Sequence, residues 1–313
     1  MAAVAKKKSE GLLGKITSPF RKKNAKPTAK KAAPEPVEKP KKPQEKLYWP
    51  PSRLNVIEKL WGQGYTTPGG ADRVKQFAPL LQLDEKKSLL LLGAGLGGIN
   101  ETLVEDTGVW VTGIEPDQEL AKMGHESMQR AGHKRKAPIR YNDMEELKLK
   151  PKSFDAMLAL DQIHTVKDKK ALFNAVTEAL RLHGEMLFIS FSLPDTNPPN
   201  EILQSWINQQ DKTPYLWPIE AMLAMLNTLD LDVRPPDDMT REYRNCVLKA
   251  WVNFLSNMNK AELKEMAADV VGECARWAEL ITAIDRGGLK VMKYNCVKVQ
   301  EKRKSVDELM AQA

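Results

Sequence analysis

One short stretch constrains the fold of this chain more than any other. Four leucines, Leu89 to Leu92, lead directly into a glycine-rich turn at positions 93 to 98. A second apolar run, Val109 to Ile114, follows and ends in Glu115. Glycines let the backbone bend tightly and come close to a bound molecule, and a carboxylate at the tip of the next strand can accept hydrogen bonds from a ribose diol. The pattern predicts a nucleoside-containing cofactor at the edge of an α/β sheet.

Apolar strand-like runs alternate with helical periodicity along most of the chain. Strands are expected at 88–92, 109–114, 139–141, 154–160, 185–191, 229–233 and 290–299, and helices at 53–62, 71–82, 117–131 and 260–284. This alternation is typical of βαβ units and a parallel sheet. We therefore predict an α/β fold with a doubly wound, seven-stranded, mostly parallel sheet. Residues 47–82 and 200–286 are expected to form a helical lid and cap.

The charge is distributed unevenly. Residues 1–46 contain 14 Lys or Arg and 4 Glu, so they carry +10, and since the whole chain carries +7 the remainder carries −3. A segment this rich in Lys, Pro and Ala cannot bury enough apolar surface to offset its ordering entropy. We predict a disordered basic tail over 1–46, a folded domain over 47–303 and a C-terminal tail over 304–313. The basic tail could contact an anionic membrane surface or an acidic partner, or serve only as a solubilising segment.

Other sequence features bear on compartment and cofactor class. No apolar run reaches the length needed to span a bilayer, and no secretory signal pattern is visible. The three cysteines, Cys246, Cys274 and Cys296, are scattered and lack metal-ligand spacing. These features predict a cytoplasmic protein, peripheral at the membrane if the tail binds there, with no metal site.

The glycine loop resembles motif I of class I S-adenosylmethionine (SAM) methyltransferases. Its glycines stand at positions 93, 95, 97 and 98, and Glu115-Pro116-Asp117 is similar to the second motif of that family. The resemblance implies SAM as the cofactor, with Gly93, Gly95 and Gly97 beneath its methionine part and Glu115 at its ribose. The acidic residue usual in motif I is replaced here by Leu91.

Asn142-Asp143-Met144 follows the short third strand. In the methyltransferase family, residues at this place contact adenine, which implies that Asp143 meets its amino group and that Met144 packs on its ring. Asp143 could also be a helix N-cap, with Glu146 completing a capping box.

The segment from Asp161 to Lys169 follows the fourth strand, where class I methyltransferases place residues that face the substrate. His164 could take a proton from an amine or hold an anionic group. A structural role, capping the following helix, is the alternative.

Residues 61–70 resemble the segment Phe-Gly-x-x-Tyr-x-Ser-x-Gly-Gly of phosphoethanolamine and related small-amine N-methyltransferases, with Thr66 and Thr67 at the positions that touch the cofactor. That family pairs an upstream tyrosine, here Tyr48, with a histidine after the fourth strand. Its histidine position is occupied by Thr165, and His164 lies one residue earlier. The resemblance thus implies the catalytic pair His164 and Tyr48. The implied cofactor contacts are Thr67, Gly93, Gly95, Gly97, Glu115, Asp143, Met144 and Asp161.

Three functions follow from these patterns. The leading hypothesis is SAM-dependent methyl transfer to a small molecule, such as an amine or a phospho-amine. The second is a catalytically impaired, methyltransferase-like scaffold docked through its basic tail, which Leu91 and the shifted His164 would favour. The third is a protein or nucleic-acid methyltransferase, although the acidic body disfavours nucleic acid.

Overall fold

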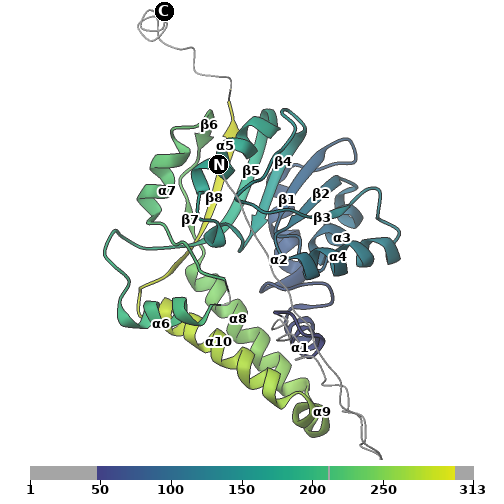
Figure 1. The fold of residues 1–313 in the computed structure, drawn as a ribbon, viewed down its shortest axis with the longest axis vertical. Helices are drawn as coiled ribbons and strands as arrows, with labels where there is room; N and C mark the ends of the chain where they lie inside the picture. Colours follow the sequence, from purple (N-terminus) through teal and green to yellow (C-terminus); the bar gives the residue numbers. More distant parts are fainter. Residues whose placement is uncertain (1–47, 211, 300–313) are drawn as a thin grey trace, which may run out of the picture. The chain divides into compact units, whose positions relative to one another are not determined.

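A single twisted sheet organises the computed structural model, which describes residues 48–210 and 212–299 (Figure 1). The strand order is β3-β2-β1-β4-β5-β8-β6, with β7 paired to β8. Strands β1 to β5 are parallel to their neighbours within that group, and β8 runs antiparallel to β5, β6 and β7. The strands are β1 Ser88–Leu92, β2 Trp110–Glu115, β3 Ile139–Tyr141, β4 Phe154–Leu160, β5 Leu180–Ser192, β6 Leu231–Val233, β7 Asp237–Asp238 and β8 Lys290–Lys298.

The predicted doubly wound, mostly parallel sheet is confirmed. The described residues contain one strand more than the seven predicted, because Asp237 and Asp238 pair with β8 opposite Lys293 and Met292. A two-residue strand has no apolar periodicity, so it could not be predicted from the pattern of residues. Strand β5 also begins earlier than predicted, at Leu180.

Helices cover both faces of the sheet. The alternate leucines of β1 belong to two separate hydrophobic cores, one on each face. Leu89 and Leu91 pack on the side of α2, α3 and α4. Leu90 and Leu92 pack on the side of α5 and α7. A parallel strand buried on both faces is expected to be apolar throughout. The α-helices are α1 Pro51–Trp61, α2 Gly70–Phe77, α3 Gly98–Thr107, α4 Gln118–Arg130, α5 Lys169–Ala179, α6 Glu201–Gln209, α7 Ile219–Leu226, α8 Thr240–Asn257, α9 Lys260–Glu265 and α10 Ala267–Asp285, and the 3-10 turns are η1 Ala78–Leu81 and η2 Ile163–Thr165.

A layer of helices lies beyond the carboxyl ends of the parallel strands. Helices α1, α6 and α8 each contact α10, and α1 also contacts α8 (Figure 1). The helix predicted over 260–284 is interrupted at Met266, whose side chain is buried in the core and whose backbone departs from helical geometry. This layer closes over the edge of the sheet where the glycine loop lies.

Several predictions concern residues that the structure does not describe. The tails over 1–46 and 304–313 lie outside the described residues, and so do their proposed contacts with membranes or acidic partners. The 47–303 domain boundaries therefore stay predictions. Within residues 48–210 and 212–299, every helix is too short or too polar to cross a bilayer.

Candidate functional site

The glycine loop forms a tight bend between β1 and α3. Gly93, Gly95 and Gly97 have φ values of 80°, 55° and 100°, a region that strongly favours glycine. A Cβ added to Gly95 would lie 3.0 Å from Thr66 Oγ1, and one added to Gly93 would lie 3.0 Å from Gln162 Cβ. The turn therefore depends on glycine both for its backbone conformation and for close packing.

The loop before α2 packs directly on this bend. The amide of Gly98 donates to the carbonyl oxygen of Gly64 at 2.9 Å. A Cβ on Gly98 would come within 2.8 Å of both Gly64 O and Tyr65 Cε2. The Tyr65 hydroxyl is also hydrogen-bonded to Thr102 of α3. Together these contacts fix the segment that carries Thr66 and Thr67 against the glycine loop.

Glu115, at the end of β2, is only 4% exposed. Its two carboxylate oxygens accept hydrogen bonds from the amides of Gly95 (2.8 Å) and Asp117 (2.9 Å). Burial raises its pKa to about 7 despite these two hydrogen bonds. Since a carboxylate has about four lone-pair sites and Glu115 lines a cavity, it retains acceptor capacity there. This arrangement fits a ribose diol.

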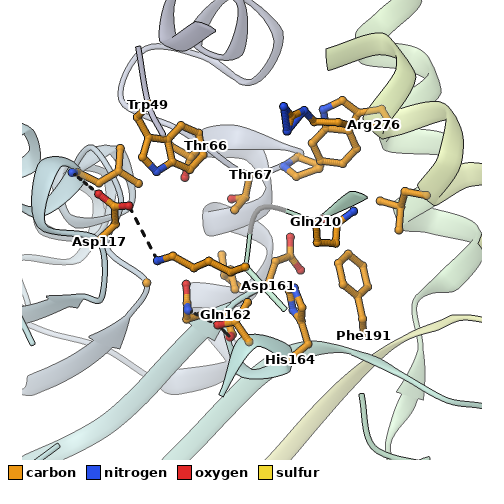
Figure 2. A pocket seen from close by; sticks show the side chains of 18 of the residues that line it. Trp49, Thr66, Thr67, Asp117, Asp161, Gln162, His164, Phe191, Gln210 and Arg276 are labelled. Atoms are coloured by element: carbon orange, nitrogen blue, oxygen red, sulfur yellow. Dashed lines mark hydrogen bonds and ion pairs between the residues drawn. The ribbon is translucent and has the colours of Figure 1, made fainter. Parts of the chain in front are cut away.

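The cavity extends from Glu115 to the helical layer, and side chains from several elements converge on it (Figure 2). The predicted site residues that line it are Tyr48, Thr67, Gly93, Glu115, Asp161 and His164. Gly95, Gly97, Asp143 and Met144 are not among the residues that line it. The structure thus brings both predicted catalytic residues to the same cavity as part of the predicted cofactor set, and the individual roles stay predictions.

Asp143 and Met144 occupy different environments. Met144 is 3% exposed and packs in the core beneath β1. Asp143 is exposed, and its Oδ1 accepts from the amide of Glu145 at 2.9 Å. The alternative reading of Asp143 as a helix N-cap is wrong, because a turn rather than a helix follows β3. A helix starting there would soon meet Pro151, which cannot continue it.

Asp161 is the centre of a buried polar network just after β4. Arg73 of α2 binds its carboxylate with two hydrogen bonds, of 2.5 and 3.0 Å, and the Tyr243 hydroxyl of α8 donates to it at 3.2 Å. The side chains of Arg73 and Asp161 are 8% and 6% exposed. Burial, reinforced by the nearby Asp161 charge, raises the pKa of Tyr243 well above its ordinary value, so Tyr243 stays a donor. The network joins the sheet to the helical layer.

His164 lies in the η2 turn and lines the cavity beside Phe191 of β5, with 4.6 Å between ring centroids (Figure 2). Its Nδ1 is buried and has no hydrogen-bond partner among the described residues. Burial lowers the pKa of His164 to about 4, with Lys169 lowering it further and Asp161 opposing the change. The structural alternative is wrong, because Asp168 caps α5 by accepting from the amide of Ala171. His164 is therefore a neutral imidazole at physiological pH.

Tyr48 also lines the cavity and lies just before α1 in the sequence. Its ring meets Trp49 edge-on at 5.2 Å, and its carbonyl oxygen accepts from Arg53 Nη1 at 3.1 Å. Arg53 in turn pairs with Glu273 of α10 at 2.5 Å. Tyr48 is thereby anchored to the helical layer, and its pairing with His164 stays a prediction.

Sequence reasoning missed Phe191 and Tyr243, which line the cavity near His164 and Asp161, and Arg73, which binds Asp161 without lining the cavity. Arg73 is the instructive case, because Gly70, Arg73, Val74 and Phe77 are the buried positions of α2. An arginine at i+3 on an apolar helical stripe signals a buried ionic partner. Tyr243 and Phe191 have no comparable local signal, since each resembles an ordinary core aromatic residue.

Leu91 does not leave a gap in the glycine loop. It is fully buried in β1, paired in register with Gly113 on one side and Leu158 on the other. The loop amide of Gly95 is bound by Glu115 instead. The loop is therefore held without an acid at position 91.

Comparisons with known proteins agree with this geometry. A family model described as mycolic acid cyclopropane synthetase matches residues 70–287. A phosphoethanolamine N-methyltransferase of Triticum aestivum is 28% identical over 51% of this chain and 31% of its own length. That of Plasmodium falciparum is 22% identical over 69% of this chain and 79% of its own. The chain thus spans about a third of the length of the wheat relative that it matches.

Solved structures show the same fold. Phosphoethanolamine N-methyltransferase 2 of Haemonchus contortus, in complex with SAM, superposes with a TM-score of 0.67 at 18% identity, covering 79% of this chain and 57% of that one. Geranyl diphosphate C-methyltransferase of Streptomyces coelicolor gives 0.58 at 14% identity, covering 80% and 99%. Since the family model covers well over half of the sequence, the chain belongs to the mycolic acid cyclopropane synthetase family, and it is similar in sequence and in fold to the phosphoethanolamine N-methyltransferases.

Proposed function

We propose that this chain transfers the methyl group of SAM to the nitrogen of a small amine, with phosphoethanolamine and its methylated forms as the leading acceptors. One observation carries the proposal: a single cavity joins Glu115 and the glycine loop to His164 and Asp161. The names of the relatives support the acceptor class. A second Haemonchus contortus structure was solved with phosphomonomethylethanolamine and S-adenosylhomocysteine.

The cofactor half of the cavity fits SAM through its own residues. SAM, when bound, supplies a methyl group activated by a positively charged sulfur. Glu115 would accept hydrogen bonds from the ribose hydroxyls, and the main chain at Gly93 would pass close to the methionine part. Thr67, held against the glycine loop, would close the same side. These residues position the methyl group, and positioning is the main requirement of a direct displacement.

The acceptor half must bring a neutral amine nitrogen to that methyl group. Simple alkyl amines are protonated at neutral pH, with a pKa near that of lysine, about 10.4, so the nitrogen must lose a proton before it attacks. Neutral His164 can accept a hydrogen bond from the ammonium group and then its proton. Phe191 has Tyr243 and Trp206 at 5.6 Å as edge-on neighbours around this end. Aromatic faces attract organic cations, which favours an amine that remains charged after methylation.

Acceptor class can be tested directly with the full chain. We would incubate it with SAM and, separately, with phosphoethanolamine, phosphomonomethylethanolamine, ethanolamine or geranyl diphosphate, and follow S-adenosylhomocysteine and the methylated product by mass spectrometry. We expect turnover with the two phospho-amines. Transfer to geranyl diphosphate with none to any amine would contradict the amine proposal. Absence of SAM binding would contradict methyl transfer and favour the scaffold hypothesis.

A further inference from the structure

Lys169, the first residue of α5, is fully buried, which is rare for lysine. Its Nζ donates to the carbonyl oxygens of Val166 (2.6 Å) and Tyr215 (2.5 Å) and lies 5.5 Å from the centre of the Trp217 ring. No carboxylate among the described residues lies within ion-pair distance of Nζ. An ammonium group has three N–H bonds, and these three contacts provide a partner for each of them.

The contacts of Lys169 connect two segments that are distant in the sequence. Val166 follows the η2 turn that carries His164, and Tyr215 belongs to the segment before α7. The amide of Tyr215 donates to the carbonyl oxygen of His164 at 2.7 Å. The turn and the segment are therefore joined twice, once through the ammonium group and once through the main chain.

The same segment is also tied to the end of β5. The amide of Leu193 donates to the carbonyl oxygen of Trp217 at 3.0 Å, and the amide of Ile219 returns a hydrogen bond to Leu193 at 3.1 Å. Phe191, which packs against the His164 ring, lies two residues before Leu193. Lys169, which does not line the cavity, thus supports the His164 turn, and the segment before α7 links that turn to Phe191.

The charge of Lys169 acts on this turn as well. Burial lowers the pKa of Lys169 to about 8, and Glu145 opposes that change. Glu145 itself accepts from the amides of Lys167 (2.6 Å) and Asp168 (3.0 Å), so it faces the same turn. The positive charge of Lys169 adds to the burial that keeps His164 neutral, while Asp161 opposes it. Glu145 and His164 are the titratable groups coupled to Lys169 here, and Asp161 is coupled to His164.

We propose that Lys169 is a positioning residue, whose buried ammonium group fixes the η2 turn to the 215–217 segment and so aims the His164 ring into the cavity. The proposal rests on the proposed function only for its effect on turnover. Its structural content is independent of the acceptor. A lysine one residue later, Lys170, is exposed and provides a matched control.

The test compares Lys169→Met with Lys170→Met by NMR titration of the histidine rings, without cofactor or acceptor. The chain has only four histidines, and a His164→Gln variant assigns the relevant signal. We expect His164 of the wild type and of Lys170→Met to titrate near pH 4, and that of Lys169→Met at a higher pH, because the Lys169 charge lowers the His164 pKa. Lys169→Arg, which keeps the charge and the donors, should restore part of the shift. An unchanged His164 titration in folded Lys169→Met would overturn the proposal.

A second measurement applies if Lys169→Met fails to fold. In the wild type, the His164 ring signal is followed from pH 6 to pH 10, where the imidazole itself is already neutral. We expect a further change centred near pH 8 as Lys169 loses its proton, and its disappearance in Lys169→Arg. A signal that stays constant over this range would contradict the proposal.

Turnover measurements distinguish a failure of the Lys169 proposal from a failure of the proposed function. With phosphoethanolamine, Lys169→Met should lower kcat at least tenfold while the Kd for SAM changes less than twofold, and Lys170→Met should change neither. If the wild type methylates no amine, the proposed function fails, but the histidine titration still decides the role of Lys169.

Discussion

The half of the cavity proposed to bind the cofactor comes mainly from one stretch of chain, Gly93 to Asp117, with Thr67 beside it. The half proposed to bind the acceptor is lined by residues that follow β4 and by residues of β5 and α8. In the first half, the Glu115 carboxylate accepts hydrogen bonds from the amides of Gly95 and Asp117, and the glycine loop supplies their geometry. In the second, Asp161 is held by Arg73 and Tyr243, which lie 88 and 82 residues away in the sequence.

The two halves are therefore sensitive to different kinds of substitution. The cofactor half depends on backbone conformation, which β1, β2 and α3 fix locally. The acceptor half depends on buried side-chain pairs, which persist only while the helical layer stays packed on the sheet. Variants of the acceptor half should therefore affect turnover or stability more than SAM binding.

The largest difference between the effect on kcat and the effect on SAM binding is expected for a substitution of His164. His164→Gln removes the group proposed to accept the acceptor's proton, a role typically worth about 10²–10⁴-fold in rate. We expect kcat to fall by that factor while the Kd for SAM stays within twofold, as measured by product formation and calorimetry. His183→Gln, at an exposed position, is the control. Equal losses of kcat and SAM affinity would show that the two halves are not separate.

Arg73→Met should have the next largest effect, because it leaves the Asp161 carboxylate buried without its cationic partner. Breaking a buried ion pair costs about 3–5 kcal/mol, measurable by urea unfolding. The double variant with Asp161→Asn should recover part of this loss, since the uncompensated charge is removed. A single variant as stable as the wild type would mean that Asp161 has another partner.

The cofactor half should respond to pH through Glu115. Its pKa is raised to about 7 in the folded chain from 4.5, so its contribution to stability is fully present below pH 4.5 and is lost as the pH rises through 7. A ribose diol binds the ionised carboxylate instead, so SAM affinity should fall about tenfold for each pH unit below 7. Calorimetry at several pH values measures this slope of SAM affinity against pH. Glu115→Gln should remove it, and a slope retained in that variant would assign the pH dependence to another group.

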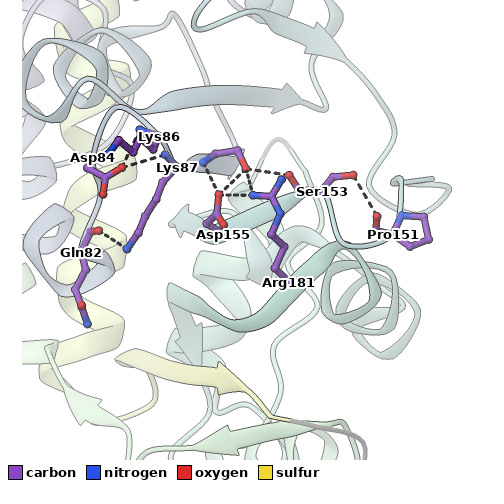
Figure 3. Close-up of polar contacts among 9 residues, drawn as sticks. Gln82, Asp84, Lys86, Lys87, Pro151, Ser153, Asp155 and Arg181 are labelled. Carbon is purple, nitrogen blue, oxygen red and sulfur yellow. Dashed lines mark hydrogen bonds and ion pairs between the residues drawn. The ribbon is translucent and has the colours of Figure 1, made fainter.

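The smallest effect is expected at the other end of β4. Asp155 pairs with Arg181 at the amino edge of the sheet, and Ser88 adds two hydrogen bonds to the same carboxylate (Figure 3). The Arg181 and Asp155 side chains are 46% and 24% exposed, and exposed pairs contribute about 0–1 kcal/mol. Arg181→Met should therefore lower the free energy of unfolding by no more than this. A loss as large as that of Arg73→Met would remove the distinction between buried and exposed pairs.

The sequence predicted the sheet and the cofactor half well, for a physical reason. Each apolar run that forms a central strand is buried on both faces, and Gly93 to Glu115 is a local pattern whose geometry is set by its own residues. The tip of β3 was harder to predict: Asp143 followed by Glu146 matches a capping box, but Pro151 leaves no room for a long helix.

The acceptor half could be predicted only in part. Asp161 and His164 follow an obvious strand, so their place at the sheet edge could be inferred. Their partners could not, because the contacts of Arg73 and Tyr243 depend on how α2 and α8 pack in three dimensions. The pair of Arg53 and Glu273 spans 220 residues, and no local pattern specifies such a contact.

Whether Glu115 and the glycine loop form a SAM site can be decided by calorimetric titration of SAM into the wild type and into Glu115→Ala. The exposed Glu146→Ala provides the control. We predict micromolar-range binding to the wild type and to Glu146→Ala, and a loss of at least about 100-fold in Glu115→Ala, consistent with removal of a buried charged acceptor. No binding to the wild type, or equal binding to all three proteins, would show that Glu115 and the glycine loop do not form a SAM site.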